Sequence, residues 1–168
     1  YGIAFYFMLL TETNMVHYLL DRGLFDKHAF VNGKFSCDAG NSRHKNYIVN
    51  KEFETNRYFV KQALGTTTEK IHSLQREGLF YELAAADKSL EPLLKYLPVL
   101  LQHDQANAIL VLEYLADYTS MYDLLLHQKK LHAAVAAQLA DALFLLHSVA
   151  AESIDKMTEA GLISISKP

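Results

Sequence analysis

Cysteine is almost absent from this chain, and its scarcity excludes the chemistries that need several thiols. Cys37 is the single cysteine among 168 residues, so no internal disulfide can form and a zinc-thiolate site has too few ligands. The eight histidines are dispersed without an HExxH pair, and no GxSxG segment supports a hydrolase triad. This cysteine usage favours a reducing, cytoplasmic compartment.

The sequence also lacks an excess of one charge sign and lacks a long apolar run. Its net charge is -3, its pI is near 6.2 and its sixteen Lys and Arg residues are scattered, so we expect no nucleic acid partner. The opening run YGIAFYFMLL has ten residues, too few to cross a bilayer, and has no signal-peptide features, so we expect no membrane partner. Because the chain starts with Tyr and ends in ISKP, we expect it to be cut from a longer protein.

Composition permits a real hydrophobic core, since 51% of the residues are hydrophobic and 21% are charged. Residues 11–25 have apolar side chains at helical spacing, with Thr11 or Thr13 as the N-cap and Gly23 as the stop. The next region is rich in turn residues and β-formers, which predicts three antiparallel strands near 29–37, 46–50 and 57–62.

The second half of the chain alternates between helical and strand patterns. Residues 69–86 predict one helix, and two apolar runs at 98–103 and 108–115, split by the polar turn HDQAN, predict two strands. Alanine and leucine are then dense enough to predict two helices, 120–128 and 129–150. The expected order is therefore helix, three strands, helix, two strands and two helices.

Four segments in this order carry a resemblance: YFVKQ as the third strand, LQREGLFYELA on the next helix, ILVLEYL as the fifth strand and LADALFLLHS as a long helix. Together they resemble the front part of protein-kinase-like phosphotransferases, in particular the aminoglycoside phosphotransferase family with its choline-kinase-like relatives. The resemblance implies an α+β fold, with a kinase-like N-lobe made of a five-stranded antiparallel sheet and one inserted helix. It divides the chain into a leading helical segment (1–27), the N-lobe and hinge (28–115) and the start of a truncated helical C-lobe (116–168).

Lys61 and Glu77 carry the chemistry that the resemblance implies. In phosphoryl transfer the protein mainly positions the nucleotide and neutralises charge, so a lysine on a rigid strand reaches the α- and β-phosphates. A lysine above an apolar sheet needs a counter-charge, which Glu77 on the following helix would supply, within salt-bridge reach of Lys61. Glu82 is the rival on the same helix. Taken alone, a lysine that ends a strand is more often an ordinary solvated or edge residue.

A hinge for the adenine ring is the second expected site, and a plain core strand is its alternative. An adenine needs an apolar slot and one free backbone carbonyl and amide, here the Glu113 carbonyl and the Leu115 amide. The full set of residues expected around the base is Ile48, Val60, Val111, Glu113, Tyr114 and Leu115. For the phosphates, the turn DAGNSRHK offers Asn41 and Ser42, although it has one glycine only and suits a bland hairpin as well.

The sequence departs from the family where catalysis would begin. After His147 it reads SVAAESIDKMTEAGLISISKP, and Asp155 has neither a preceding histidine-glycine pair nor an asparagine five residues later. The resemblance therefore implies the nucleotide-holding half of an ATP-dependent phosphotransferase that acts on the hydroxyl of a small molecule, with the base and the Mg²⁺ ligands outside this chain. ATP and GTP are not distinguished, and the oligomeric state stays open. Two alternatives remain: a pseudokinase-like binding or regulatory module, and an α+β scaffold that resembles the family by chance.

Overall fold

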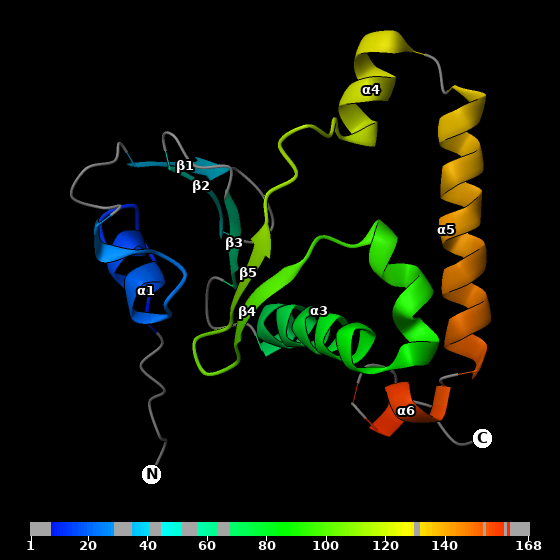
Figure 1. Ribbon diagram of the computed structural model, residues 1–168, viewed down its shortest axis with the longest axis horizontal. Coiled ribbons are helices and arrows are strands. Elements are labelled where there is room, and N and C mark those ends of the chain that lie inside the picture. The colour runs from blue at the N-terminus through cyan, green and yellow to red at the C-terminus, as the bar shows by residue number, and fades with distance from the viewer. Residues whose placement is uncertain are drawn as a thin grey trace. The chain divides into compact units, whose positions relative to one another are not determined.

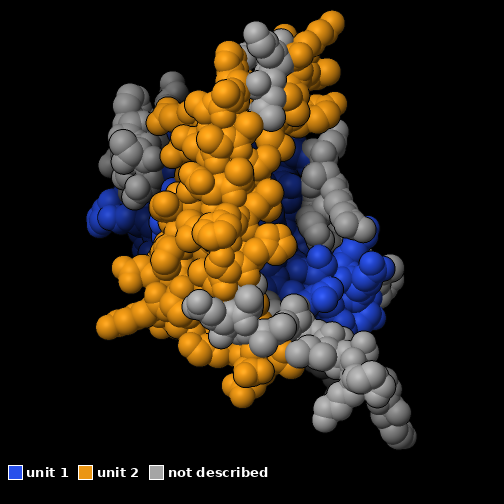
Figure 2. Space-filling view, turned by 90° about the vertical axis from the view of Figure 1, so that its right-hand side faces the viewer, with its two compact units in different colours: residues 1–78, 99–114 blue, residues 79–98, 115–168 orange. Residues whose placement is uncertain are grey.

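The computed structural model describes residues 8–28, 35–40, 45–51, 57–63, 68–129, 132–152, 154–159 and 161. Over these ranges the chain is α+β, with a five-stranded antiparallel sheet and several helices (Figure 1). It divides into two compact units, which Figure 2 colours separately. Unit 1 comprises Tyr1–Gly78 and Val99–Tyr114, and unit 2 comprises Leu79–Pro98 and Leu115–Pro168.

The sheet lies in unit 1 and confirms the expected five antiparallel strands. Its strands are β1 (Phe35–Gly40), β2 (Lys45–Lys51), β3 (Tyr58–Gln62), β4 (Leu100–Asp104) and β5 (Ile109–Glu113). Their spatial order is β1-β2-β3-β5-β4, so β3 lies in the centre between β2 and β5. The expected inserted helix, α3 (Thr68–Ala86), follows β3 in sequence, but a second helical element that was not expected, the 3-10 helix η1 (Lys88–Tyr96), lies between α3 and β4. Residues 29–34 of the expected first strand lie outside the described residues, and β1 continues to Gly40, past the expected end at 37 and into the expected turn DAGNSRHK.

One face of the sheet packs against α1 (Met15–Asp21) and forms the core of unit 1. The fully or nearly buried members of this core are Leu10, Met15, Tyr18, Leu19, Phe25, Tyr47, Val49, Tyr58, Val60, Ile109 and Val111. Each large apolar side chain removed from water contributes roughly 1.5–3 kcal/mol. The helix is shorter than the expected 11–25, because Asn14, and neither Thr11 nor Thr13, is its N-cap. Its chain turns at Gly23, whose φ of 69° suits glycine.

Asp104, at the end of β4, ties the sheet to α1. Its side chain is 4% exposed and pairs with the Arg22 guanidinium, while Tyr18 and Asn107 also donate hydrogen bonds to it. Burial by itself raises the pKa of a carboxyl, but the hydrogen bonds from Asn107 and the charge of Arg22 outweigh it and lower the pKa of Asp104. The native state therefore holds this carboxylate ionised.

Unit 2 is helical. Two of its elements, the 3-10 helix η1 and the helix α6, were not expected from the sequence. It contains the C-terminal part of α3, the 3-10 helix η1 (Lys88–Tyr96), α4 (Met121–Gln128), α5 (Ala133–Glu152) and α6 (Ile154–Glu159). Its core consists of Ala84, Leu90, Leu93, Val149 and Met157. The expected helix 120–128 is confirmed, whereas α5 begins later than 129, because Lys129 adopts a left-handed conformation that ends α4. No helix within the described ranges is both long and apolar enough to cross a membrane.

Asp87 joins η1 to α6, and its titration gives a first prediction. Hydrogen bonds from Lys156 and from the Ser89 backbone lower the pKa of Asp87 to about 2. A lowered pKa stabilises the native state above the unfolded pKa, about 3.9, and this contribution is lost as the pH falls towards 2. We expect Lys156→Met to raise the pKa of Asp87 towards the ordinary value, as measured by NMR titration of its carboxyl carbon. An unchanged pKa would contradict the assignment of Lys156 as the main cause.

Candidate functional site

The central strand β3 divides its side chains between the two faces of the sheet. Tyr58, Val60 and Gln62 are buried on the α1 face, while Phe59 and Lys61 are partly exposed on the opposite face. Gln62 accepts a hydrogen bond from the Leu10 amide at 2.9 Å and is 2% exposed. Buried neighbours on both sides of Lys61 therefore fix the strand from which its side chain projects.

Lys61 forms an ion pair with Glu77, which confirms the expected contact. The Lys61 Nζ atom donates to the Glu77 Oε1 atom at 2.6 Å, and the two side chains are 22% and 30% exposed. Both residues belong to unit 1, with Glu77 on α3. Glu82, the rival on the same helix, is exposed. An ammonium that is fixed to a rigid strand and still reaches solvent can attract an anionic ligand.

An aromatic ring lies beside the Lys61 ammonium on the same face. The Lys61 Nζ atom is 5.8 Å from the centroid of the Phe59 ring, within the range of a cation–π contact. Phe59 lies opposite Ile48 on β2 and opposite Leu112 on β5. Residues opposite one another share a face, so the partly exposed Phe59 and Ile48 form an apolar patch next to the cation, with the buried Leu112 packed beside Phe59.

The residues expected from the sequence included neither Phe59 nor Leu112. The signal that could have found both is the period of two in a strand. Phe59 precedes Lys61 by two positions and so shares its face, and Leu112 follows from the register with Phe59. The expected Ile48 does lie on this face.

Val60 and Val111 lie on the other face, which corrects their expected place beside the base. They are opposite each other in the β3–β5 register, and both are 0% exposed in the core against α1. Because a strand alternates its side chains, a residue next to Lys61 in sequence cannot share its face. The structure brings Lys61, Glu77 and Ile48 together and leaves Val60 and Val111 out.

The backbone at the end of β5 is partly used by the sheet. The Glu113 amide donates to the Val99 carbonyl and the Tyr114 amide donates to the Arg57 carbonyl, both at 2.9 Å. Leu115 follows directly, is 36% exposed and is the first residue of the segment that belongs to unit 2. The amides of Glu113 and Tyr114 are therefore committed to the sheet.

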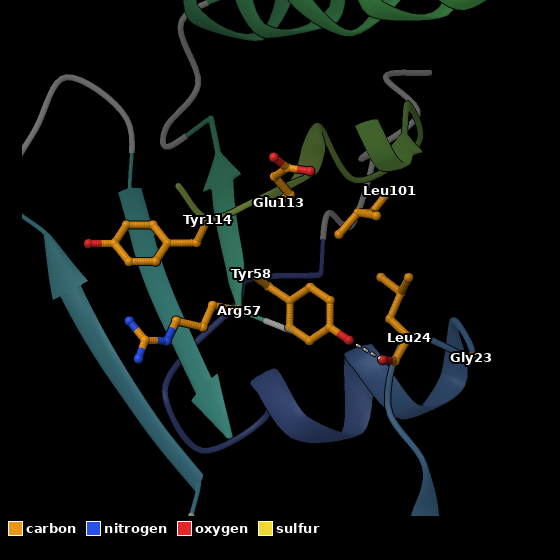
Figure 3. Close-up of a pocket in the computed structure, with 7 residues that line it drawn as sticks. All are labelled: Gly23, Leu24, Arg57, Tyr58, Leu101, Glu113 and Tyr114. Carbon is orange, nitrogen blue, oxygen red and sulfur yellow. Dashed lines mark hydrogen bonds between the residues drawn. The ribbon is translucent and has the colours of Figure 1, made fainter. Parts of the chain in front are cut away.

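A pocket of about 440 Å³ also lies in unit 1, but it opens on the α1 face (Figure 3). Its lining residues are Gly23, Leu24, Arg57, Tyr58, Leu101, Glu113 and Tyr114. Tyr58 donates a hydrogen bond to the Leu24 carbonyl at 2.6 Å, drawn as a dashed line in Figure 3. Tyr58 and Glu113 are opposite each other in register and have the parity of Val60, so this pocket is separate from the face of Lys61.

Two expected phosphate contacts, Asn41 and Ser42, lie outside the described residues. Where the chain is described, no three or more His, Cys, Asp or Glu residues come together in a group that could hold a metal ion. The site as described therefore consists of one cation, its carboxylate partner and an apolar patch.

No family model matches the chain, and no curated protein matches it. The function is therefore inferred from the site itself.

Proposed function

We propose that the chain is the nucleotide-binding half of an ATP-dependent phosphotransferase of the aminoglycoside-phosphotransferase-like group. The parent protein would phosphorylate a hydroxyl of a small molecule, in the cytoplasm. The observation that carries the proposal is the Lys61–Glu77 ion pair on a sheet face that also bears an apolar patch. The sheet, together with the helix α3 that follows its third strand, resembles the lobe of a protein-kinase-like fold.

In this proposal the ion pair serves the phosphates. A nucleotide triphosphate is highly anionic, and the protein must supply a cation at a fixed place, since positioning and charge neutralisation account for most of the catalysis of phosphoryl transfer. Lys61 binds the α- and β-phosphates. Glu77 holds the ammonium in place when the phosphates are absent and orients it when they bind, which lowers the ordering cost of binding.

The apolar patch serves the base. Phe59 presents an aromatic ring on which a purine stacks, and Ile48 and Leu112 flank it on the neighbouring strands. At the end of β5, the Glu113 carbonyl would bind the edge of the base, as in the hinge that the sequence resembles. A cation beside an apolar patch matches a ligand with a charged end and a flat aromatic end.

This chain binds and orients, and the transfer itself needs other groups. Mg²⁺ bound with ATP would neutralise charge on the β- and γ-phosphates. Its carboxylate ligands and the catalytic base are expected in parts of the parent protein other than these 168 residues, because Asp155 lacks the neighbours of a catalytic aspartate. The acceptor hydroxyl would also bind there.

Replacing Phe59 tests the base-binding half of the proposal. We expect Phe59→Ala to weaken adenosine binding by about 1–3 kcal/mol, the usual contribution of one aromatic residue that stacks on a base. Binding of inorganic tripolyphosphate, which has no base, should be unchanged. Isothermal titration calorimetry measures both ligands, and Phe144→Ala, at an exposed phenylalanine of α5, is the matched control. Equal losses for both ligands would contradict the assignment of Phe59 to the base.

A non-catalytic nucleotide-binding regulatory module is the second candidate, and the sequence around Asp155 favours it. Position 160, five residues after Asp155, is alanine where a catalytic loop would have asparagine. A phosphate-transfer assay on the full-length protein distinguishes the two candidates. Transfer of labelled phosphate from Mg-ATP to small-molecule hydroxyls supports the enzyme, whereas tight binding of Mg-ATP without transfer supports the module. Absence of nucleotide binding would leave a scaffold that resembles the family by chance.

A further inference from the structure

Gly78 lies against His103, and no larger residue fits between them as they stand. A Cβ atom added to Gly78 would lie 2.5 Å from the Cδ2 and Cε1 atoms of the His103 imidazole. Gly78 is buried within α3, where glycine is less favourable than alanine because it loses more backbone entropy. Glycine is unfavourable in this helix, but it leaves room for the His103 imidazole. We therefore infer that Gly78 allows α3 and β4 to approach each other closely.

The contact between Gly78 and His103 is next to the ion pair in both sequence and space. Glu77 directly precedes Gly78 on α3. On the sheet, His103 is opposite Leu110, and Leu110 is opposite Lys61, so His103 and Lys61 share one face. Two consecutive residues of α3 therefore contact two strands of the same face, Glu77 through its charge and Gly78 through its missing side chain.

We propose that Gly78 and His103 are positioning residues that set how closely α3 approaches the sheet, and thereby set the geometry in which Glu77 holds Lys61. The functional part of this inference rests on the proposed nucleotide site. A side chain at position 78 forces one of two responses: the helix moves away from β4, or the imidazole turns aside. The first response carries Glu77 away from Lys61, because helix residues move together.

The contact itself is tested without ligand by thermal unfolding of the 168-residue chain. We expect Gly78→Ala to lower Tm when His103 is present and to raise Tm when it is made in a His103→Ala background. In the second background the overlap is gone and the better helix propensity of alanine remains. Ser73→Ala, at an exposed position of α3, controls for propensity alone. The same sign of the Gly78→Ala effect in both backgrounds would overturn the spacing role.

The effect on the ion pair is read from the Lys61 ammonium, again without ligand. In ¹⁵N-lysine NMR spectra, Gly78→Ala should shift the Lys61 Nζ resonance and speed its proton exchange, because the Glu77 partner has moved. The double variant Gly78→Ala/His103→Ala should return the resonance to its original position. A Lys61 resonance that does not respond to Gly78→Ala overturns the positioning claim, even if Tm falls.

Nucleotide binding then tests the functional consequence. We expect Gly78→Ala to weaken Mg-ATP binding about tenfold, which corresponds to about 1.4 kcal/mol, and to leave adenosine binding unchanged. The double variant should recover the affinity for Mg-ATP. A merely structural defect would weaken both ligands equally and would overturn the inference. If the unchanged chain binds neither ligand, the proposed nucleotide function fails, while the NMR and Tm results still decide whether Gly78 and His103 position Glu77.

Discussion

We expect Lys61→Met to abolish most of the thermal stabilisation that Mg-ATP would give to this chain if it binds as proposed. Methionine keeps the length and the apolar stem of the side chain but removes the ammonium that would bind the phosphates. A ligand that binds only the native state stabilises it by RT ln(1 + [L]/Kd), so loss of a charge-assisted contact of about 1.5–3 kcal/mol reduces the Tm shift at any fixed ligand concentration. Differential scanning fluorimetry with and without millimolar Mg-ATP measures the effect.

The control for this experiment is Lys88→Met, which removes an exposed lysine of η1. It should leave the Mg-ATP shift unchanged, and adenosine should stabilise wild type and Lys61→Met alike. Glu77→Gln should also reduce the Mg-ATP shift, but less than Lys61→Met, because the cation remains and only its orientation is lost. Equal Mg-ATP shifts in wild type and Lys61→Met would remove Lys61 from the phosphate site.

Asp104→Ala has the largest expected effect on stability. The substitution leaves the guanidinium of Arg22, the hydroxyl of Tyr18 and the side-chain amide of Asn107 without their acceptor. Removing one partner of a buried, hydrogen-bonded ion pair is costly, although the side chain of Arg22 is 38% exposed and regains part of its hydration. We therefore expect a loss of about 2–4 kcal/mol in the free energy of unfolding, measured with urea. Asp21→Ala, at an exposed position of α1, should change stability little.

The same carboxyl predicts a pH dependence with a definite sign. Its pKa is lower in the native state than in the unfolded state, so its contribution is fully present above about pH 4 and is lost as the pH falls through the native pKa. Wild type should therefore lose stability more steeply than Asp104→Asn as the pH falls below about 4, because the asparagine has no charge to lose there. Parallel losses in the two proteins would show that Asp104 is not responsible.

The sheet was predictable from the sequence because its signals are local. Turn residues separate short runs rich in apolar and β-branched or aromatic residues, such as the YFV of YFVKQ, which marks a strand. The 3-10 helix η1 was not predictable in this way, since Pro92 interrupts helical periodicity and Asp87 acts as its N-cap through a contact with Ser89. The start of α1 was misplaced because three of the four residues from 11 to 14 are plausible caps; the structure places Asn14 at the N-cap, where its side chain accepts a hydrogen bond from the Thr11 amide.

At the candidate site, the sequence predicted the Lys61–Glu77 contact correctly but did not predict on which face of the sheet Val60 and Val111 lie. Glu77 was correctly matched to Lys61, because a helix after a short loop brings an acidic residue over the strand. Val60 and Val111 were assigned to the wrong face, because strand parity was not applied relative to Lys61. The role of Gly78 could not be read from sequence at all. It depends on His103, which lies on β4, twenty-five positions further along the chain, and approaches Gly78 of α3 only in the folded chain.

The nucleotide site is tested most directly by NMR of methyl groups on the two faces of the sheet. Mg-ATP is titrated into chain labelled at isoleucine and valine methyls, with Ile48 reporting on the face of Lys61 and Val60 on the face against α1. A bound purine on Phe59 should shift the Ile48 methyl resonance progressively through its ring current, while the Val60 methyls stay in place. Saturating nucleotide that leaves Ile48 unmoved, or that moves Val60 instead, would contradict a nucleotide site on this face.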